Sequence, residues 1–282
     1  MHAKTEPPLL SIVVVNYNYG RFLETAIKSI IEQDGFMKCE LIIIDGGSTD
    51  NSVDVIKKYA DNIAYWVSEK DNGQSDAFNK GFAKARGRLG CWVNADDILL
   101  PGTLQAVIDL IVCRLDIEWV TGGIVFFDNE MKIRKMRKGT WITKGMHRWV
   151  DATVIGGPSS FFSLKQLKRV GGFNLELHYT MDCDLWQKFF ASGMTMHHID
   201  RYFWGFRIHE ASKTAHALTG AKTSSFQAED DMQFDGRRFS KEQISRHVIM
   251  LRIFKVINGT LIRSLMDTKR YFGKNVFDVF MG

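Results

Sequence analysis

The chain has 282 residues, with 37 Lys or Arg against 32 Asp or Glu and a formal net charge of +5. This mild excess suits an anionic substrate or an anionic membrane surface, whereas no clustered Lys/Arg stripe with interleaved aromatics outside the C-terminal tail indicates a nucleic-acid partner. The four cysteines have no C-x-x-C spacing, which argues against a disulfide framework and a zinc site.

Neither a secretory signal nor a membrane-spanning helix is predicted. The N-terminal region has no small-residue cleavage site, and no uninterrupted apolar stretch approaches the roughly 20 residues needed to cross a bilayer. The expected location is therefore the cytoplasm, with peripheral contact to the inner face of the plasma membrane left open.

The first half of the chain alternates short β-branched runs with helical patterns, which is typical of a parallel α/β sheet. The expected strands are 12–15, 41–44, 63–67 and 89–93, and the expected helices are 22–31, 53–59, 77–85 and 101–112. Pro101 fits the first turn of the last helix.

Beyond residue 112 the pattern is less regular. Two strands, 119–127 and 133–136, are expected to be joined by a turn at Asp128 and Asn129 without a helix between them. The other expected elements are helices at 164–170 and 184–191 and strands at 195–199 and 202–208.

A polar cluster follows each strand of the first half. Ligands of open parallel sheets bind at the carboxyl ends of the strands, so these clusters are expected to converge on one rim. The clusters are Asn16 to Tyr19, Asp45 to Asp50, Ser68 to Gly73 and Asn94 to Asp97.

The adjacent carboxylates Asp96 and Asp97 have two interpretations. Like charges side by side raise each other's pKa unless a cation or hydrogen bonds hold them ionised. Hard oxygen ligands of this kind hold Mg²⁺ or Mn²⁺ together with substrate phosphates. Alternatively, one of the pair caps the helix that begins near Pro101.

Asp45 also follows a strand, and the glycines Gly46 and Gly47 allow a backbone to approach a ligand closely. The Asp45 carboxylate can accept hydrogen bonds from a nucleotide base. The residues after the glycines, Ser48 to Asp50, can equally cap the next helix. The chain contains neither G-x-x-x-x-G-K-[ST] nor G-x-G-x-x-G, which disfavours a P-loop kinase and a classical dinucleotide enzyme.

Further candidates lie in the second half. Asp182 and Asp184 stand just ahead of an aromatic helix, where a carboxylate serves either as a general base or as a cap. His209 follows a strand among polar residues and is either a metal or diphosphate ligand or a surface residue. Trp186 is either part of the core or a stacking face for a sugar.

The C-terminal tail, 244–280, interleaves apolar residues with Arg and Lys at helical spacing. This pattern indicates a basic amphipathic helix that either rests on an anionic bilayer or packs against the protein or a second subunit.

Five stretches taken in order resemble the signatures of family 2 inverting glycosyltransferases with the GT-A fold. The likeness covers roughly residues 9–212, and the ordered set is far more specific than any one motif. The stretches are SIVVVNYNYG, LIIIDGGSTD, SEKDNGQSDAFNKG, WVNADD and MDCDLW.

The resemblance implies a Rossmann-like, mostly parallel sheet flanked by helices. The GT-A catalytic domain would span 1–214, with a nucleotide-sugar half at 9–113 and an acceptor half at 114–214. A helical, basic amphipathic extension would follow at 215–282.

The resemblance also implies a nucleotide-sugar donor, with a UDP-sugar the best guess, and Mn²⁺ or Mg²⁺ as cofactor. Asp45 would read the base, and residues 94–96 stand where the family keeps its D-x-D motif, with Asn in the first place. The metal would fall to Asp96, with Asp97 as a helper and His209 as a further ligand. Other donor contacts would come from Asn16, Asn18, Ser48, Asp71, Asn79 and Asn94.

In the place of the family's catalytic base stands Asp182, preceded here by Met181 rather than Glu. The acceptor would be a hydroxyl of a saccharide or lipid-linked saccharide in cell-surface glycan biosynthesis, attacked with inversion at the anomeric carbon. The competing interpretations are a nucleotidyltransferase, which would usually carry a basic Gly-rich loop after the first strand, and a catalytically silent nucleotide-sugar binding or membrane scaffold protein.

Overall fold

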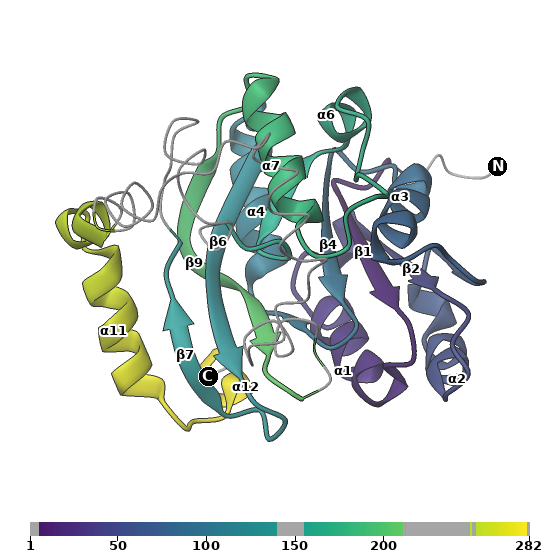
Figure 1. Cartoon of the computed structure of the whole chain (residues 1–282), viewed down its shortest axis with the longest axis horizontal. Coiled ribbons are helices and arrows are strands. Elements are labelled where there is room, and N and C mark those ends of the chain that lie inside the picture. Colours follow the sequence, from purple (N-terminus) through teal and green to yellow (C-terminus); the bar gives the residue numbers. More distant parts are fainter. Residues whose placement is uncertain (1–5, 140–154, 211, 213–248, 250–251, 281–282) are drawn as a thin grey trace.

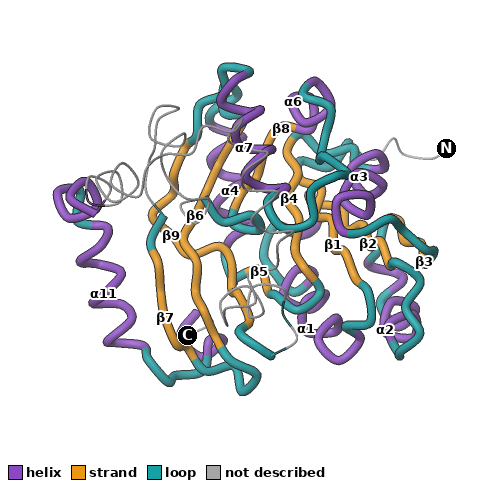
Figure 2. Tube along the Cα trace, viewed as in Figure 1, coloured by secondary structure: helices purple, strands orange, loops and turns teal. Residues whose placement is uncertain are grey.

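A single curved sheet, flanked by helices, organises the chain in a computed structural model that describes residues 6–139, 155–210, 212, 249 and 252–280 (Figures 1 and 2). The described residues form a nine-stranded sheet in which the path runs β3-β2-β1-β4-β8-β6-β9-β5, and β7 pairs with β6. The α/β class expected from the sequence is confirmed. Within these described ranges, no helix is long and apolar enough to cross a membrane.

The first half of the sheet is entirely parallel, as predicted. Its strands are β1 (Leu10–Asn16), β2 (Cys39–Asp45), β3 (Tyr65–Ser68) and β4 (Leu89–Asn94). The register pairs Asn16 with Asp45, Asp45 with Ser68, and Val15 with Asn94. The polar strand ends therefore meet at one edge of the sheet.

Helices cover both faces of this half because alternate residues of each strand point to opposite sides. Ile12 and Val14 belong to the core beneath α1 and α4, whereas Val13 and Val15 pack with the aromatic residues of α3 and α7. The helices are α1 (Gly20–Ile31), α2 (Ser52–Lys58), α3 (Gln74–Lys84), α4 (Thr103–Cys113), α6 (Leu164–Arg169) and α7 (Met181–Ala191), and two 3₁₀ turns lie at Phe36–Lys38 and Ala60–Asn62.

The second half of the sheet is mixed in direction. The strands are β5 (Ile98–Leu99), β6 (Trp119–Phe127), β7 (Ile133–Arg137), β8 (Ser160–Ser163) and β9 (His197–Arg207). The predicted hairpin of β6 and β7 is confirmed. The two strands expected at 195–199 and 202–208 are instead one strand, since irregular register with β6 lets β9 continue through exposed Asp200 and Arg201.

The sequence pattern of the C-terminal tail predicted a helix. The tail instead contains several separate helical pieces. Gly259 and Gly273 adopt φ values of 73° and 75° and separate a helical turn at 252–257 from α11 (Thr260–Tyr271) and α12 (Val276–Phe280). A left-handed glycine commonly ends a helix. The fully buried Val276 joins the core under β5, β6 and β7, so the end of the chain shares a core with the sheet.

Hydroxyl groups of α11 hydrogen-bond the backbone of the edge strand β7 and the residue after it. Met136 N donates to Thr268 Oγ1 at 2.9 Å, and Lys138 N donates to Ser264 Oγ at 2.9 Å. Edge strands carry unpaired backbone groups that otherwise promote aggregation. These side chains satisfy such groups without a further strand.

Removing one of these hydroxyls is expected to destabilise the protein. Thr268→Val leaves the amide of buried Met136 without its acceptor, which should lower the free energy of unfolding by about 1–2 kcal/mol. Thr268→Ser keeps the hydroxyl and should lose less. Denaturant unfolding measures both, and a Thr268→Val protein as stable as the parent would contradict this role.

Candidate functional site

A buried carboxylate joins the ends of β1 and β2. Asp45 is fully buried. Its Oδ1 accepts hydrogen bonds from Asn16 Nδ2 at 2.6 Å and Ser48 Oγ at 2.5 Å. Its Oδ2 accepts from Ser48 N at 2.9 Å and Ser68 Oγ at 2.5 Å. Asp45 thereby fixes three polar side chains at the edge of the sheet, and it can meet a ligand only by exchanging one of these bonds.

The loop after β1 is tied to the loop after β2. Asn18 has a left-handed φ of 56°, a conformation that Asn tolerates better than most residues. Its backbone N donates to Ser48 Oγ at 2.8 Å, and its Oδ1 accepts from Thr49 N at 2.8 Å. Asn16, Asn18, Asp45 and Ser48 thus form one network, called here the donor rim.

Of residues 48–50, which were also predicted as possible caps of the next helix, Asp50 takes a capping role. Asp50 Oδ1 accepts from Ser52 N at 3.0 Å at the start of α2, and Oδ2 accepts from Gly20 N at 2.9 Å at the start of α1. Carboxylates are favourable at helix N-termini. Ser48 instead belongs to the donor rim.

Asp71 lies beside the donor rim. A Cβ added to Gly46 would fall 2.6 Å from Asp71 Oδ2, so any other residue at position 46 would displace the Asp71 side chain. Asp71 Oδ1 accepts from Gly73 N at 2.9 Å. The loop after β3 therefore reaches back to the loop after β2, as the convergence of the strand ends predicts.

Asn94, at the end of β4, joins two elements. Its Nδ2 donates to Asp97 Oδ2 at 2.9 Å, and its Oδ1 accepts from Gln74 Nε2 at 3.0 Å. Gln74 is the first residue of α3. No role was predicted for Gln74, because no local pattern distinguishes it from the other polar residues of its loop.

The two adjacent carboxylates have different surroundings. Asp97 is 2% exposed, and its Oδ1 accepts from Arg207 N at 3.0 Å. Burial, and then the neighbouring charge of Asp96, raise the pKa of Asp97 well above its usual value. Neither Asp caps α4, because that helix begins at Thr103 after Gly102. The capping interpretation is therefore wrong.

Asp96 faces a buried histidine. Asp96 Oδ2 lies 3.0 Å from His209 Nε2, and the His209 side chain is fully buried, with its ring 4.9 Å from that of Phe22. Arg207 Nε donates to the Asp96 carbonyl oxygen at 2.9 Å. The interpretation of His209 as a surface residue is wrong, and β9 brings it to the end of β4.

Asp96 Oδ2 and His209 Nε2 are within the distance of a hydrogen bond or ion pair. Adjacent ligands of an octahedral ion with bonds of about 2.1 Å lie a similar distance apart, so both side chains can reach one divalent cation if it replaces their mutual contact. Among the residues that the structure describes, no group of three or more His, Cys, Asp or Glu side chains is arranged to hold a metal. A cation here would need the oxygens of a substrate to complete its coordination.

Asp182 lies in the first turn of α7, not ahead of the helix as expected. Its Oδ1 accepts from Cys183 N at 2.9 Å. The preceding loop contacts the start of α3: Ser75 Oγ donates to the Leu177 carbonyl at 2.8 Å, and a Cβ on Gly73 would lie 3.5 Å from the ring of His178. These contacts hold the loop before α7 against the start of α3, where Gln74 binds Asn94.

Three other candidates in this region have structural partners. Asp184 forms an ion pair with Lys188 at 2.8 Å on the same helix. Trp186 is fully buried and stacks on Trp92, so it offers no face to a sugar, and that interpretation is wrong. The Asn79 amide exchanges two hydrogen bonds with the backbone of Phe173, at 2.8 and 2.9 Å.

Sequence comparisons match this chain to sugar-transferring enzymes. The profile of Glycosyl transferase family 2 matches residues 11–166. An uncharacterized glycosyltransferase of Rickettsia typhi is 25% identical over 287 residues, covering 98% of this chain and 83% of that protein. One from a Nostoc species is 38% identical over 104 residues, covering 36% of this chain and 32% of that protein.

Solved structures share the fold. S. aureus TarS (residues 1–349) superposes with a TM-score of 0.58 at 18% identity, covering 80% of this chain and 69% of that one, and TarS was also solved with UDP-GlcNAc. The mannosyltransferase PcManGT of Pyrobaculum calidifontis, in complex with GDP-Man and Mn²⁺, gives 0.60 at 14% identity, covering 98% and 79%. The likeness confirms the GT-A fold.

Proposed function

Because this chain belongs to glycosyl transferase family 2, we propose that it transfers a sugar from a nucleoside-diphosphate sugar to an acceptor hydroxyl with inversion at the anomeric carbon. The observation that carries the proposal is the Asp96–His209 pair just after β4, the strand that pairs with β1 beside the donor rim. Nucleotide sugars bound to TarS and PcManGT support a donor of this class.

The donor rim is proposed to receive the nucleotide, and a UDP-sugar is the proposed donor. Asn16, Asn18 and Ser48 would contact it directly, as would Asp71 beside Gly46. Asp45 would act through the side chains that it holds, with base contact after exchange of one hydrogen bond. The remaining proposed donor residues are Asn94, whose amide can bond a ribose hydroxyl, and Asn79, which would position the loop at Phe173.

We assign the divalent cation, Mn²⁺ or Mg²⁺, to Asp96 and His209. When bound, the cation would stabilise the departing diphosphate as a Lewis acid. Asp97 would support the cation site indirectly. Its two oxygens accept hydrogen bonds from Asn94 and from the backbone of Arg207, and these bonds would orient the loop that carries Asp96. Buried partners of this kind fix the orientation of metal ligands.

Asp182 is proposed as the general base. Its carboxylate would accept the proton of the acceptor hydroxyl while the oxygen attacks the anomeric carbon from the side opposite the diphosphate. One carbon–oxygen bond forms as the bond to the diphosphate breaks, which inverts the anomeric configuration. Asp182 lies in the first turn of α7, where the amide groups of a helix N-terminus stabilise negative charge. The acceptor is proposed to be a saccharide or lipid-linked saccharide of cell-surface glycan synthesis.

Donor binding gives the first test. In a thermal-shift screen of UDP-, GDP- and dTDP-sugars with Mn²⁺, we expect a UDP-sugar to raise Tm by about 5 °C at saturating concentration. The shift should shrink when Mn²⁺ is replaced by a chelator. Stabilisation by nucleoside triphosphates and by no nucleotide sugar would contradict the proposal and favour a nucleotidyltransferase.

A further inference from the structure

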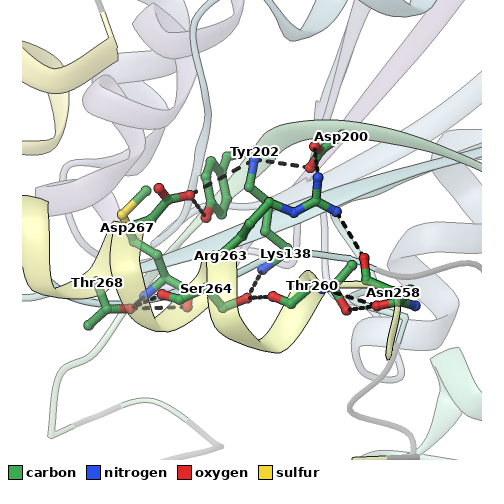
Figure 3. Close-up of polar contacts among 10 residues, drawn as sticks. Lys138, Asp200, Tyr202, Asn258, Thr260, Arg263, Ser264, Asp267 and Thr268 are labelled. Carbon is green, nitrogen blue, oxygen red and sulfur yellow. Dashed lines mark hydrogen bonds and ion pairs between the residues drawn. The ribbon is translucent and has the colours of Figure 1, made fainter. Parts of the chain in front are cut away.

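α11 packs on the sheet through its polar side. Besides the hydroxyls of Ser264 and Thr268 that bind the β7 edge, Asp267 accepts from the Tyr202 hydroxyl at 2.6 Å (Figure 3). Arg263 Nη1 reaches Asp200 at 3.1 Å. Hydrogen bonds and ion pairs, rather than apolar burial, therefore set the orientation of this helix.

The opposite side of α11 is apolar and exposed. Ile262, Leu265 and Met266 are 50%, 63% and 65% exposed, whereas Ser264 is 8% exposed. With Lys269 they follow the spacing i, i+3, i+4 and i+7, which places them on one side of a helix; these four residues are called here the outer face. A helix of a soluble protein normally turns such residues inward, so this arrangement is reversed.

The apolar exposure extends into the segment that precedes α11 and just beyond its end. In the helical turn at 252–257, the exposed fractions of Ile253, Val256 and Ile257 are 48%, 46% and 78%. Phe272, directly after α11, is 58% exposed. Several exposed apolar side chains within one segment indicate an interaction surface more strongly than a single one does.

The exposed basic residues next to these apolar residues are Arg252, Lys269 and Arg270, whereas Arg263 is paired with Asp200. The single acidic residue of 252–272, Asp267, lies on the inner side, bonded to Tyr202. Lys255 lies near two cations of β7: burial, then the charges of Arg137 and Lys135, lower its pKa to about 8. The basic residues of 252–272 are Arg252, Lys255, Arg263, Lys269 and Arg270.

We propose that the outer face of α11 docks on the surface of an anionic bilayer, with its apolar side chains at the acyl boundary and with Arg252, Lys269 and Arg270 at the lipid phosphates. Exposed apolar side chains combined with Lys and Arg are the features that hold interfacial helices on anionic lipid. A second copy of the chain fits less well, because a two-fold contact through this face would bring two surfaces of the same positive sign together.

The two proposals can be tested separately. Vesicle binding requires no sugar donor, and donor binding requires no membrane. The inference rests on the proposed function only in that a lipid-linked acceptor would lie in the membrane that the outer face contacts.

The test is co-sedimentation of the full chain with vesicles of phosphatidylcholine and phosphatidylserine, compared with phosphatidylcholine alone. We expect binding to the anionic vesicles that is about tenfold weaker without phosphatidylserine. Leu265→Glu/Met266→Glu should weaken the binding about tenfold or more. Lys269→Glu/Arg270→Glu should remove the preference for anionic lipid.

The matched control is Met37→Glu/Leu115→Glu, which makes the same kind of change at apolar residues that are 95% and 80% exposed and lie outside the C-terminal segment. It should bind vesicles like the parent, and all variants should keep the parental Tm. The proposal is overturned if the parent ignores anionic vesicles or if Leu265→Glu/Met266→Glu binds them equally well. A Leu265→Glu/Met266→Glu variant whose only change is from dimer to monomer would also overturn the proposal. So would a lower Tm in this variant alone, because the face would then be covered by the chain itself.

Discussion

Asp182→Asn is expected to lower turnover by about a hundredfold or more, since general-base catalysis contributes about 10²–10⁴ to the rate. Asn has nearly the same size and keeps an oxygen that can accept the hydrogen bond from Cys183 N, but its amide cannot take the proton of the acceptor hydroxyl. The dissociation constant of the donor should change little. Initial rates of nucleoside diphosphate release with acceptor, and calorimetry for the donor, measure the two effects.

Asp184→Asn is the matched control for this prediction. It lies on the same helix and carries the same charge, but it pairs with Lys188 and has no assigned role in the reaction. Its turnover should stay within a few fold of the parent. If Asp182→Asn turns over like the parent, or if both variants lose activity to the same degree, Asp182 is not the base.

The second large effect is expected for Asp96→Ala. The variant removes one of the two side chains assigned to the cation, so the part of donor affinity that depends on Mn²⁺ should disappear. Losing a ligand of this kind typically costs more than the tenfold to hundredfold associated with outer partners. Calorimetric titration of the donor with and without Mn²⁺ measures the difference directly.

Asp109→Ala serves as its control, because this carboxylate is exposed on α4 and bonds only Gln105 among the contacts of the described chain. It should retain full Mn²⁺ dependence. Both variants should have a similar Tm, which would show that the weaker donor binding of Asp96→Ala is not caused by unfolding. An Asp96→Ala protein that binds the donor with undiminished Mn²⁺ dependence would contradict the metal assignment.

Much of the parallel half could be predicted because its signals are local. Each β-branched run is followed by its own helix, and the register then brings the polar strand ends together. Asn16 beside Asp45, and Asn94 one strand away, follow from that geometry alone. Boundaries were less accurate: α3 begins three residues earlier than its apolar pattern, at Gln74.

The contacts that were missed depend on pairing between distant segments. β5 has two residues and β8 has four, too short for a periodic signal, and both form only against strands far along the chain. Arg207 reaches Asp96 across 111 positions of sequence. No local pattern indicates such a contact, so the buried Arg207 side chain beside Asp96 and Asp97 was not predicted.

The tail shows that a local pattern can predict an element without deciding which of its sides packs on the protein. Its amphipathic spacing predicted helix, and helix is present in α11. A helix on a soluble protein is expected to turn its apolar side inward. The edge of β7 needs hydrogen-bond partners, and the hydroxyls of Ser264 and Thr268 supply them, so the polar side packs instead.

The most direct test is a crystal structure with a UDP-sugar and Mn²⁺, with the metal located by its anomalous signal. We expect the ion at about 2 Å from Asp96 and His209, the nucleotide along the donor rim, and the anomeric carbon facing the Asp182 carboxylate. A donor bound elsewhere, or an ion that contacts neither Asp96 nor His209, would contradict the assignment of this sheet edge as the transfer site.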